Sequence, residues 1–205
     1  MKKPKYWSLA KKTLSKKDKV IKKIIATHSG SLVSRNDPFF SLCRSIIGQQ
    51  ISVQSADSVW KKFSHKAKKI IPKNILKLSK SQLSSCGLSR QKIEYLKILA
   101  KKFDDKSIDI KKLKEMDDEE AIKYLSEVKG IGRWTAEMFL FFNQLRPDIY
   151  PVQDIGLLKA ISKNYKTAYP PPQKKIEELK KLWSPYATVA TWYMWRSIDP
   201  VPVKY

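Results

Sequence analysis

The chain has 205 residues, which is enough for one or two compact lobes with buried cores. It carries 42 Lys and Arg residues against 19 acidic ones, a formal net charge of +23, so we expect a polyanionic partner such as nucleic acid. A Lys-rich proteome would give the same excess, because only six of the basic residues are Arg. No apolar run approaches the roughly 20 residues that span a bilayer, and residues 1–23 lack the continuous apolar core of a signal peptide, so we expect an intracellular protein without a membrane segment.

The two cysteines lie in apolar patterns and are expected to be buried thiols. Two cysteines cannot hold a four-thiolate iron–sulfur cluster or a cysteine-only zinc site, so neither is expected. Residues 1–30 begin as a basic tail, followed by a helix around Val20–Ile25 for which Gly30 is a plausible C-terminal cap.

Asn36-Asp37-Pro38 is a strong helix start, because a capping side chain precedes a proline in the first turn. The helix is expected to end at Gly48, and Ser52 can cap the next one. Gln49 and Gln50 therefore lie at a helix junction. Their amides would either hydrogen-bond neighbouring carbonyls or project into a DNA groove and fill the gap left by an extruded base.

Further along, Ser89 can cap a helix, and Asp117 with Glu120 has the spacing of a capping box. Helical apolar spacing continues after Asp154, after the three prolines at 170–172, and after Pro185. No stretch alternates as a strand does. The sequence therefore predicts an all-α protein of about ten short helices.

Gly130-Ile131-Gly132 lies between two helical patterns and predicts a tight hairpin, with the second helix starting at about Arg133. Amide groups exposed at a helix N-terminus attract a phosphate through hydrogen bonds and the helix dipole. An ordinary connector between two helices would have the same glycines, since G-x-G alone is a weak motif.

Four stretches together are similar to one known family. They are F-F-S-L-C-R-S-I-I-G-Q-Q-I-S, G-L-S-R-Q-K-I-E-Y-L-K-I-L-A, V-K-G-I-G-R-W-T-A-E-M-F-L with Y-P-V-Q-D, and W-S-P-Y-A-T-V-A-T-W-Y-M-W-R, in that order. The chain resembles the helix-hairpin-helix DNA glycosylases with a conserved aspartate, and within them the 3-methyladenine DNA glycosylase II family of alkylbase repair enzymes. The likeness spans residues 39 to 196.

The resemblance implies one glycosylase unit over residues 1–205, made of two helical lobes that flank a cleft. Lobe A would comprise about residues 1–48 and 145–205. Lobe B would comprise about 49–144 and include a helix-hairpin-helix motif at 117–143. The implied partner is double-stranded DNA with damaged bases, bound by a monomer located with the DNA, in the nucleoid or the nucleus. The implied process is base excision repair of alkylation damage.

The resemblance also assigns site residues. Asp154 matches the catalytic aspartate, and a base pocket is implied at Trp134, Met138 and Trp195, with Met138 where many relatives have Tyr. The residues expected to contact DNA are Gly130, Ile131, Gly132, Arg133 and Thr135 of the hairpin, with Gln49, Gln50, Ser52 and Arg90. A monovalent cation, Na⁺ or K⁺, is expected at the backbone of Val128 and Gly130, and no other cofactor.

An alkylated purine already carries positive charge, so it leaves without protonation and a single carboxylate suffices to stabilise the sugar cation. Asp154 would supply that carboxylate, although a helix N-cap before Ile155 is the simpler role. In related glycosylases that also cut the strand, a Lys stands at the position of Trp134. The tryptophan predicts a monofunctional enzyme that lacks lyase activity.

Two alternatives stay open at this point. One is a DNA-binding helix-hairpin-helix protein without catalysis, which would have no reason to combine Asp154 with Trp134. The other is a glycosylase for hypoxanthine, uracil or oxidised guanine.

Overall fold

The computed structural model describes residues 3–199. This part of the chain forms twelve α-helices and one short 3-10 helix, and no strand, so the predicted all-α fold is confirmed. Among the same residues, no helix combines the length and the apolar character that crossing a membrane requires.

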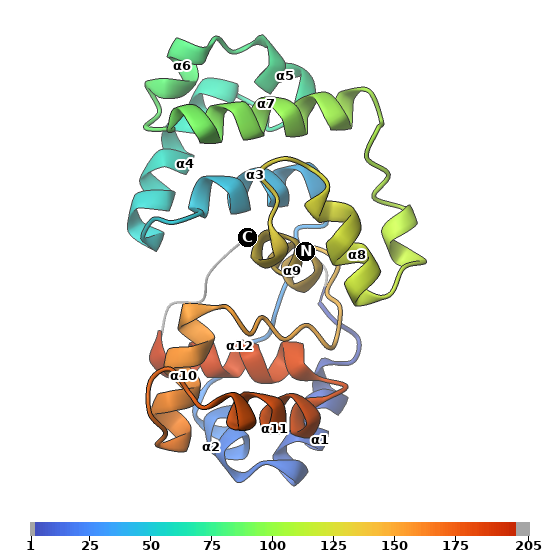
Figure 1. Ribbon diagram of the computed structural model, residues 1–205, viewed down its shortest axis with the longest axis vertical. Helices are drawn as coiled ribbons and strands as arrows, with labels where there is room; N and C mark the ends of the chain where they lie inside the picture. Colours follow the sequence, from blue (N-terminus) through green and yellow to red (C-terminus); the bar gives the residue numbers. More distant parts are fainter. Residues whose placement is uncertain (1–2, 200–205) are drawn as a thin grey trace. The chain divides into compact units, whose positions relative to one another are not determined.

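The described residues divide into two compact units, of which unit 1 comprises residues 3–36 and 140–199. Its helices are α1 (Trp7–Lys17), α2 (Lys19–Thr27), α10 (Ile155–Tyr165), α11 (Gln173–Trp183) and α12 (Ala187–Ile198). Helix α12 contacts the other four (Figure 1). Eight consecutive residues of α12, from Ala187 to Met194, are buried, as expected for a helix that is surrounded on all sides.

The N-terminal segment differs from the expected basic tail. Residues 7–17 form α1, and Trp7, Ala10 and Leu14 bury one side of it. These three follow helical spacing, but the lysines between them lower the average hydropathy and hide the stripe. Gly30 is not the cap of α2, since that helix ends at Thr27.

Unit 2 comprises residues 37–139. Its elements are α3 (Pro38–Gly48), α4 (Val53–Ala67), α5 (Pro72–Lys77), α6 (Lys80–Ser84), α7 (Arg90–Asp104), the 3-10 helix at Lys112–Lys114, α8 (Asp118–Ser126) and the first part of α9 (Arg133–Phe142). Helix α7 is central and packs against α3, α5 and α6 (Figure 1).

Every predicted N-terminal cap in unit 2 is confirmed. Asp37, Ser52, Ser89 and Asp117 each accept a backbone N–H from the first turn of the helix that follows. Helix α3 starts at Pro38 and ends at Gly48, as its sequence indicates. Cys43 and Cys86 are buried thiols, as expected.

The boundaries of the units differ from those expected for the lobes. Helix α3 was expected in lobe A, but it belongs to unit 2, because it packs on α4 and α7. The second boundary falls inside α9, after Phe139, rather than after residue 144. The expected lobe boundaries came from the family resemblance, whereas the place of α3 follows from its contacts with α4 and α7 in this chain.

Candidate functional site

The hairpin between α8 and α9 is a tight turn at residues 127–132. The N–H of Ile131 donates to the carbonyl of Val128 at 2.9 Å, and both side chains are buried. Gly130 has φ +96°, a conformation that side-chain-bearing residues rarely adopt. The predicted hairpin is therefore present, and apolar side chains on each side of Gly130 hold it to the unit.

Tyr95 of α7 explains why residue 130 must be glycine. A Cβ atom on Gly130 would lie 2.3 Å from Cγ and 2.7 Å from Cβ of Tyr95. These atoms are close to the Tyr95 backbone and cannot swing aside. A second contact joins the same helix to the hairpin, since Lys129 Nζ donates to Glu94 Oε1 at 2.5 Å.

The two glutamines at the α3–α4 junction differ in their surroundings. Gln49 Nε2 donates to the carbonyl of Gly130 and to Oγ1 of Thr135, each at 2.9 Å. Thr135 is buried, and its hydroxyl oxygen accepts the amide of Gln49; a contact of Thr135 with DNA stays a prediction. Gln50 is exposed and has φ +56°. Of the two roles that the sequence left open, Gln49 has the structural one, and the gap-filling role stays a prediction for Gln50.

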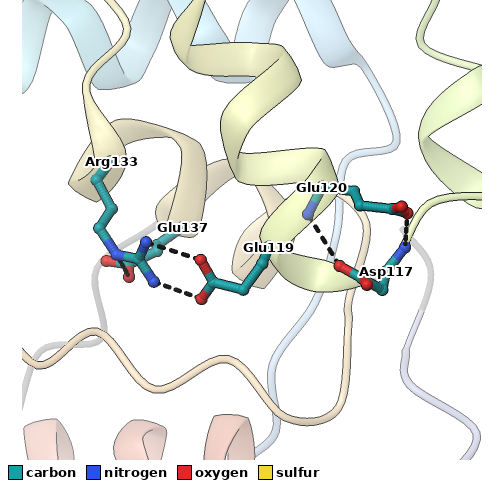
Figure 2. A network of polar contacts seen from close by, with 5 residues as sticks. All are labelled: Asp117, Glu119, Glu120, Arg133 and Glu137. Atoms are coloured by element: carbon teal, nitrogen blue, oxygen red, sulfur yellow. Dashed lines mark hydrogen bonds and ion pairs between the residues drawn. The ribbon is translucent and has the colours of Figure 1, made fainter.

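The guanidinium group of Arg133, a residue expected to contact DNA, is exposed and pairs with two carboxylates of the protein (Figure 2); its contact with DNA stays a prediction. Nη1 and Nη2 donate to the two carboxylate oxygens of Glu119, at 2.8 and 2.5 Å, and Nε donates to Glu137 at 3.0 Å. Paired charges of this kind are strong and directional. Arg133 thus connects the first turn of α9 to the first turn of α8, the two helices that the hairpin joins.

The start of α8, which carries Glu119, is itself fixed by a capping box. Asp117 accepts the N–H of Glu120 at 2.8 Å, and Glu120 accepts the N–H of Asp117 at 3.0 Å (Figure 2). The exposed cations of Arg133 and Lys129 are thus each paired with a carboxylate. Binding of a phosphate by the backbone amides of the hairpin stays a prediction.

In unit 1, Asp154 is the N-cap of α10, and its Oδ1 accepts the N–H of Leu157 at 2.7 Å. The same oxygen accepts Nε1–H of Trp195, from α12, at 2.8 Å. The ring of Trp195 stacks on Phe142, with 5.9 Å between centroids and 7° between planes. The polar edge of Trp195 thus orients the carboxylate, and its expected place in the base pocket stays a prediction.

Trp134 and Met138 lie one turn apart on α9, a spacing that puts them on the same face. Trp134 is half-buried, whereas Met138 is 2% exposed. Ser52 and Arg90, both expected at the DNA, are exposed at the starts of α4 and α7. Their part in DNA binding stays a prediction.

A monovalent cation at the hairpin backbone also stays a prediction. The carbonyl of Val128 accepts the N–H of Ile131, and the carbonyl of Gly130 accepts the amide of Gln49. Each carbonyl oxygen has a second lone pair with which it can bind a cation. Within residues 3–199, no group of three or more His, Cys, Asp or Glu side chains is placed to hold a metal ion.

The fold and these contacts define an all-α protein with a helix-hairpin-helix motif and a carboxylate oriented at a helix N-terminus. Residues 43–185 match the model of the HhH-GPD superfamily of base excision DNA repair proteins. The chain belongs to this family.

Relatives and solved structures agree with that assignment. An alkylbase DNA glycosidase-like protein of Schizosaccharomyces pombe, mag2, is 32% identical over 164 residues, which cover 78% of this chain and 77% of the relative. A DNA-3-methyladenine glycosidase from Bacillus halodurans superposes with TM-score 0.78 at 28% identity, over 96% of this chain and 92% of the other. The S. pombe 3-methyladenine DNA glycosylase Mag1, in complex with abasic DNA, has TM-score 0.83 at 24% identity, over 96% and 99%.

We expect Trp195→Phe to slow catalysis without unfolding the protein. Phenylalanine retains a ring that can stack on Phe142 but cannot donate a hydrogen bond to Asp154. Loss of one bond to a charged group corresponds to about 1.5–3 kcal/mol, or roughly ten- to a hundredfold in the excision rate. Single-turnover kinetics with thermal unfolding checks this. An unchanged rate would show that Trp195 does not position the carboxylate.

Proposed function

We propose that this chain is a monofunctional DNA glycosylase that hydrolyses the N-glycosidic bond of alkylated purines of the 3-methyladenine type. The observation that carries the proposal is the carboxylate of Asp154, which is partly exposed and is oriented by two donors on one oxygen, Leu157 N–H and Trp195 Nε1–H. A carboxylate fixed in this way can stabilise a cationic sugar as the bond to the base breaks, because it does not have to reorient as the charge develops.

The choice of alkylated purines rests on chemistry and on the relatives. An alkylated purine has a positive charge and is a good leaving group, so a site with one carboxylate and no separate acid is sufficient. The B. halodurans protein is described as a 3-methyladenine glycosidase. Trp134 would stack on the cationic base, an arrangement in which the attraction reaches about 2 kcal/mol once water is removed.

The absence of lyase activity rests on Trp134. Relatives that cleave the strand form a Schiff base through a Lys at this position, and an indole has no amine with which to do so. The enzyme would therefore leave an intact strand with an abasic site. The hairpin amides would hold a phosphate, Gln50 would fill the vacated space in the duplex, and the chain would act as a monomer.

The test uses duplexes that each carry one defined lesion. We expect release of 3-methyladenine or 7-methylguanine, with strand breaks only after alkali. Hypoxanthine, uracil and 8-oxoguanine duplexes are separate arms, and excision confined to one of them would reassign the substrate. Borohydride should trap no covalent complex between enzyme and DNA. If the protein binds these duplexes but releases no base from any of them, the proposal fails and the chain is a DNA-binding helix-hairpin-helix protein without catalysis.

A further inference from the structure

Two lysines of α7 each bind carbonyl groups at the C-terminal end of another helix of unit 2. Lys92 Nζ donates to the carbonyls of Ile47 and Gln49, each at 2.8 Å, where α3 ends. Lys97 Nζ, five residues later, donates to the carbonyls of Ile75, Leu76 and Leu78, at 2.9, 2.7 and 2.5 Å, where α5 ends. Both ammonium groups donate to carbonyls in the last turn of a helix or just after it, where the helix dipole is negative; the carbonyl of Ile75 also accepts the N–H of Leu78.

The position of Lys92 has a consequence for the next residue along the chain. The carbonyl of Gln49 belongs to the peptide group that precedes Gln50, and the orientation of this group determines φ of Gln50. That φ is +56°, in the left-handed region, which is unfavourable for a residue with a side chain. A strained conformation persists only when neighbouring groups hold it. Lys92 is one such group, because it fixes the carbonyl of Gln49.

The side chain of Gln49 connects the turn between α3 and α4 to the hairpin. Its amide donates to the carbonyl of Gly130 in the hairpin and to Thr135 in the first turn of α9. These partners are 81 and 86 residues away in the sequence. Gln49 is therefore held through its carbonyl by α7 and through its amide by the hairpin, and Gln50 and the exposed Ile51 follow directly after it.

We propose that Lys92 and Gln49 are positioning residues that lock the α3–α4 turn to the hairpin, so that Gln50 projects in a fixed relation to the phosphate-binding amides. The proposal rests on the proposed function, in which Gln50 enters the duplex while the hairpin holds its backbone. Neither Lys92 nor Gln49 needs to touch DNA. The lock would restrict the turn before DNA arrives, and binding would then cost less conformational entropy.

The test compares Lys92→Met with Lys97→Met. Both changes remove a lysine of α7 that binds carbonyls at the end of a helix, so both should lower the thermal stability to a similar extent. We expect only Lys92→Met to weaken binding to a duplex with an abasic site, by roughly tenfold, because only Lys92 contacts the turn. In a Gln50→Ala background the added loss from Lys92→Met should disappear, since the two residues act as one unit.

Gln49→Met is tested by hydrogen exchange without DNA. We expect the Ile131 amide to exchange roughly tenfold faster, since two hydrogen bonds that hold the hairpin are lost. In the Lys97→Met protein, the Ile131 amide should exchange at the wild-type rate. Neither abasic-duplex binding nor exchange requires base excision, so both remain informative if no lesion is released. Equal binding losses in Lys92→Met and Lys97→Met, or additivity with Gln50→Ala, would overturn the inference while leaving the glycosylase proposal intact.

Discussion

Asp154→Asn is expected to abolish detectable base excision while the protein still folds and binds DNA. Asparagine has the same shape and keeps an oxygen that can accept the N–H of Leu157 and the Nε1–H of Trp195. It is also as good an N-cap as aspartate, so α10 should form normally. The substitution removes only the negative charge, and losing an oriented electrostatic stabiliser slows a reaction by roughly 10²–10³-fold or more.

Asp37→Asn is the matched control for this experiment. Asp37 is the N-cap of α3 and accepts the N–H of Phe40 at 3.0 Å, so the same chemical change is made at a second helix start. We expect wild-type excision from it. Single-turnover release of the alkylated base and anisotropy with an abasic duplex measure the two functions separately. An Asp154→Asn protein that excises at the wild-type rate would remove Asp154 from the chemistry and reduce it to a helix cap.

Features that depend on near neighbours in the chain could be predicted from the sequence. The N-caps at Asp37, Ser52 and Asp154 were predicted, since each cap involves a side chain and an amide two or three residues later. The hairpin at Gly130 was predicted for the same reason. Such contacts form within one turn and are little affected by the rest of the fold.

Contacts across the sequence could not be predicted in the same way. Nothing local indicates that Gln49 would bind Gly130 or that Tyr95 would occupy the space beside it, since these pairs meet only when α3, α7 and the hairpin pack. The family resemblance predicted that Trp195 lies in the base pocket. It did not predict the hydrogen bond from Trp195 to Asp154, which is 41 residues away in the sequence.

Arg133 shows how much of a charged residue's role depends on the fold. It was expected to contact DNA, which stays a prediction, and in the structure its guanidinium group pairs with Glu119 and Glu137. One signal was available: Glu137 follows Arg133 by four residues, the spacing at which opposite charges meet on a helix. The partner at Glu119, on α8, required the fold.

Gly130→Ala is expected to disrupt the hairpin and to weaken DNA binding by at least about tenfold. Two costs add together. A residue with a side chain at φ +96° is strained by about 1–2 kcal/mol, and the new Cβ would lie 2.3 Å from Cγ of Tyr95. The hairpin must move to relieve the clash, which shifts the amides that hold the phosphate and breaks the hydrogen bond from Gln49 to the carbonyl of residue 130.

Gly132→Ala separates the effect on the fold from the effect on DNA. No atom lies within 4 Å of a Cβ at Gly132, so thermal stability should match the wild type. The Gly132→Ala protein should bind DNA more weakly only if DNA closely approaches the backbone of residue 132. Adding Tyr95→Ala to Gly130→Ala removes the 2.3 Å contact with Cγ but leaves the 2.7 Å contact with Cβ and the backbone strain, so binding to an abasic duplex should recover only in part. If Gly130→Ala binds that duplex as tightly as the wild type, the hairpin does not hold the DNA, and the positive charge of the chain must bind it elsewhere.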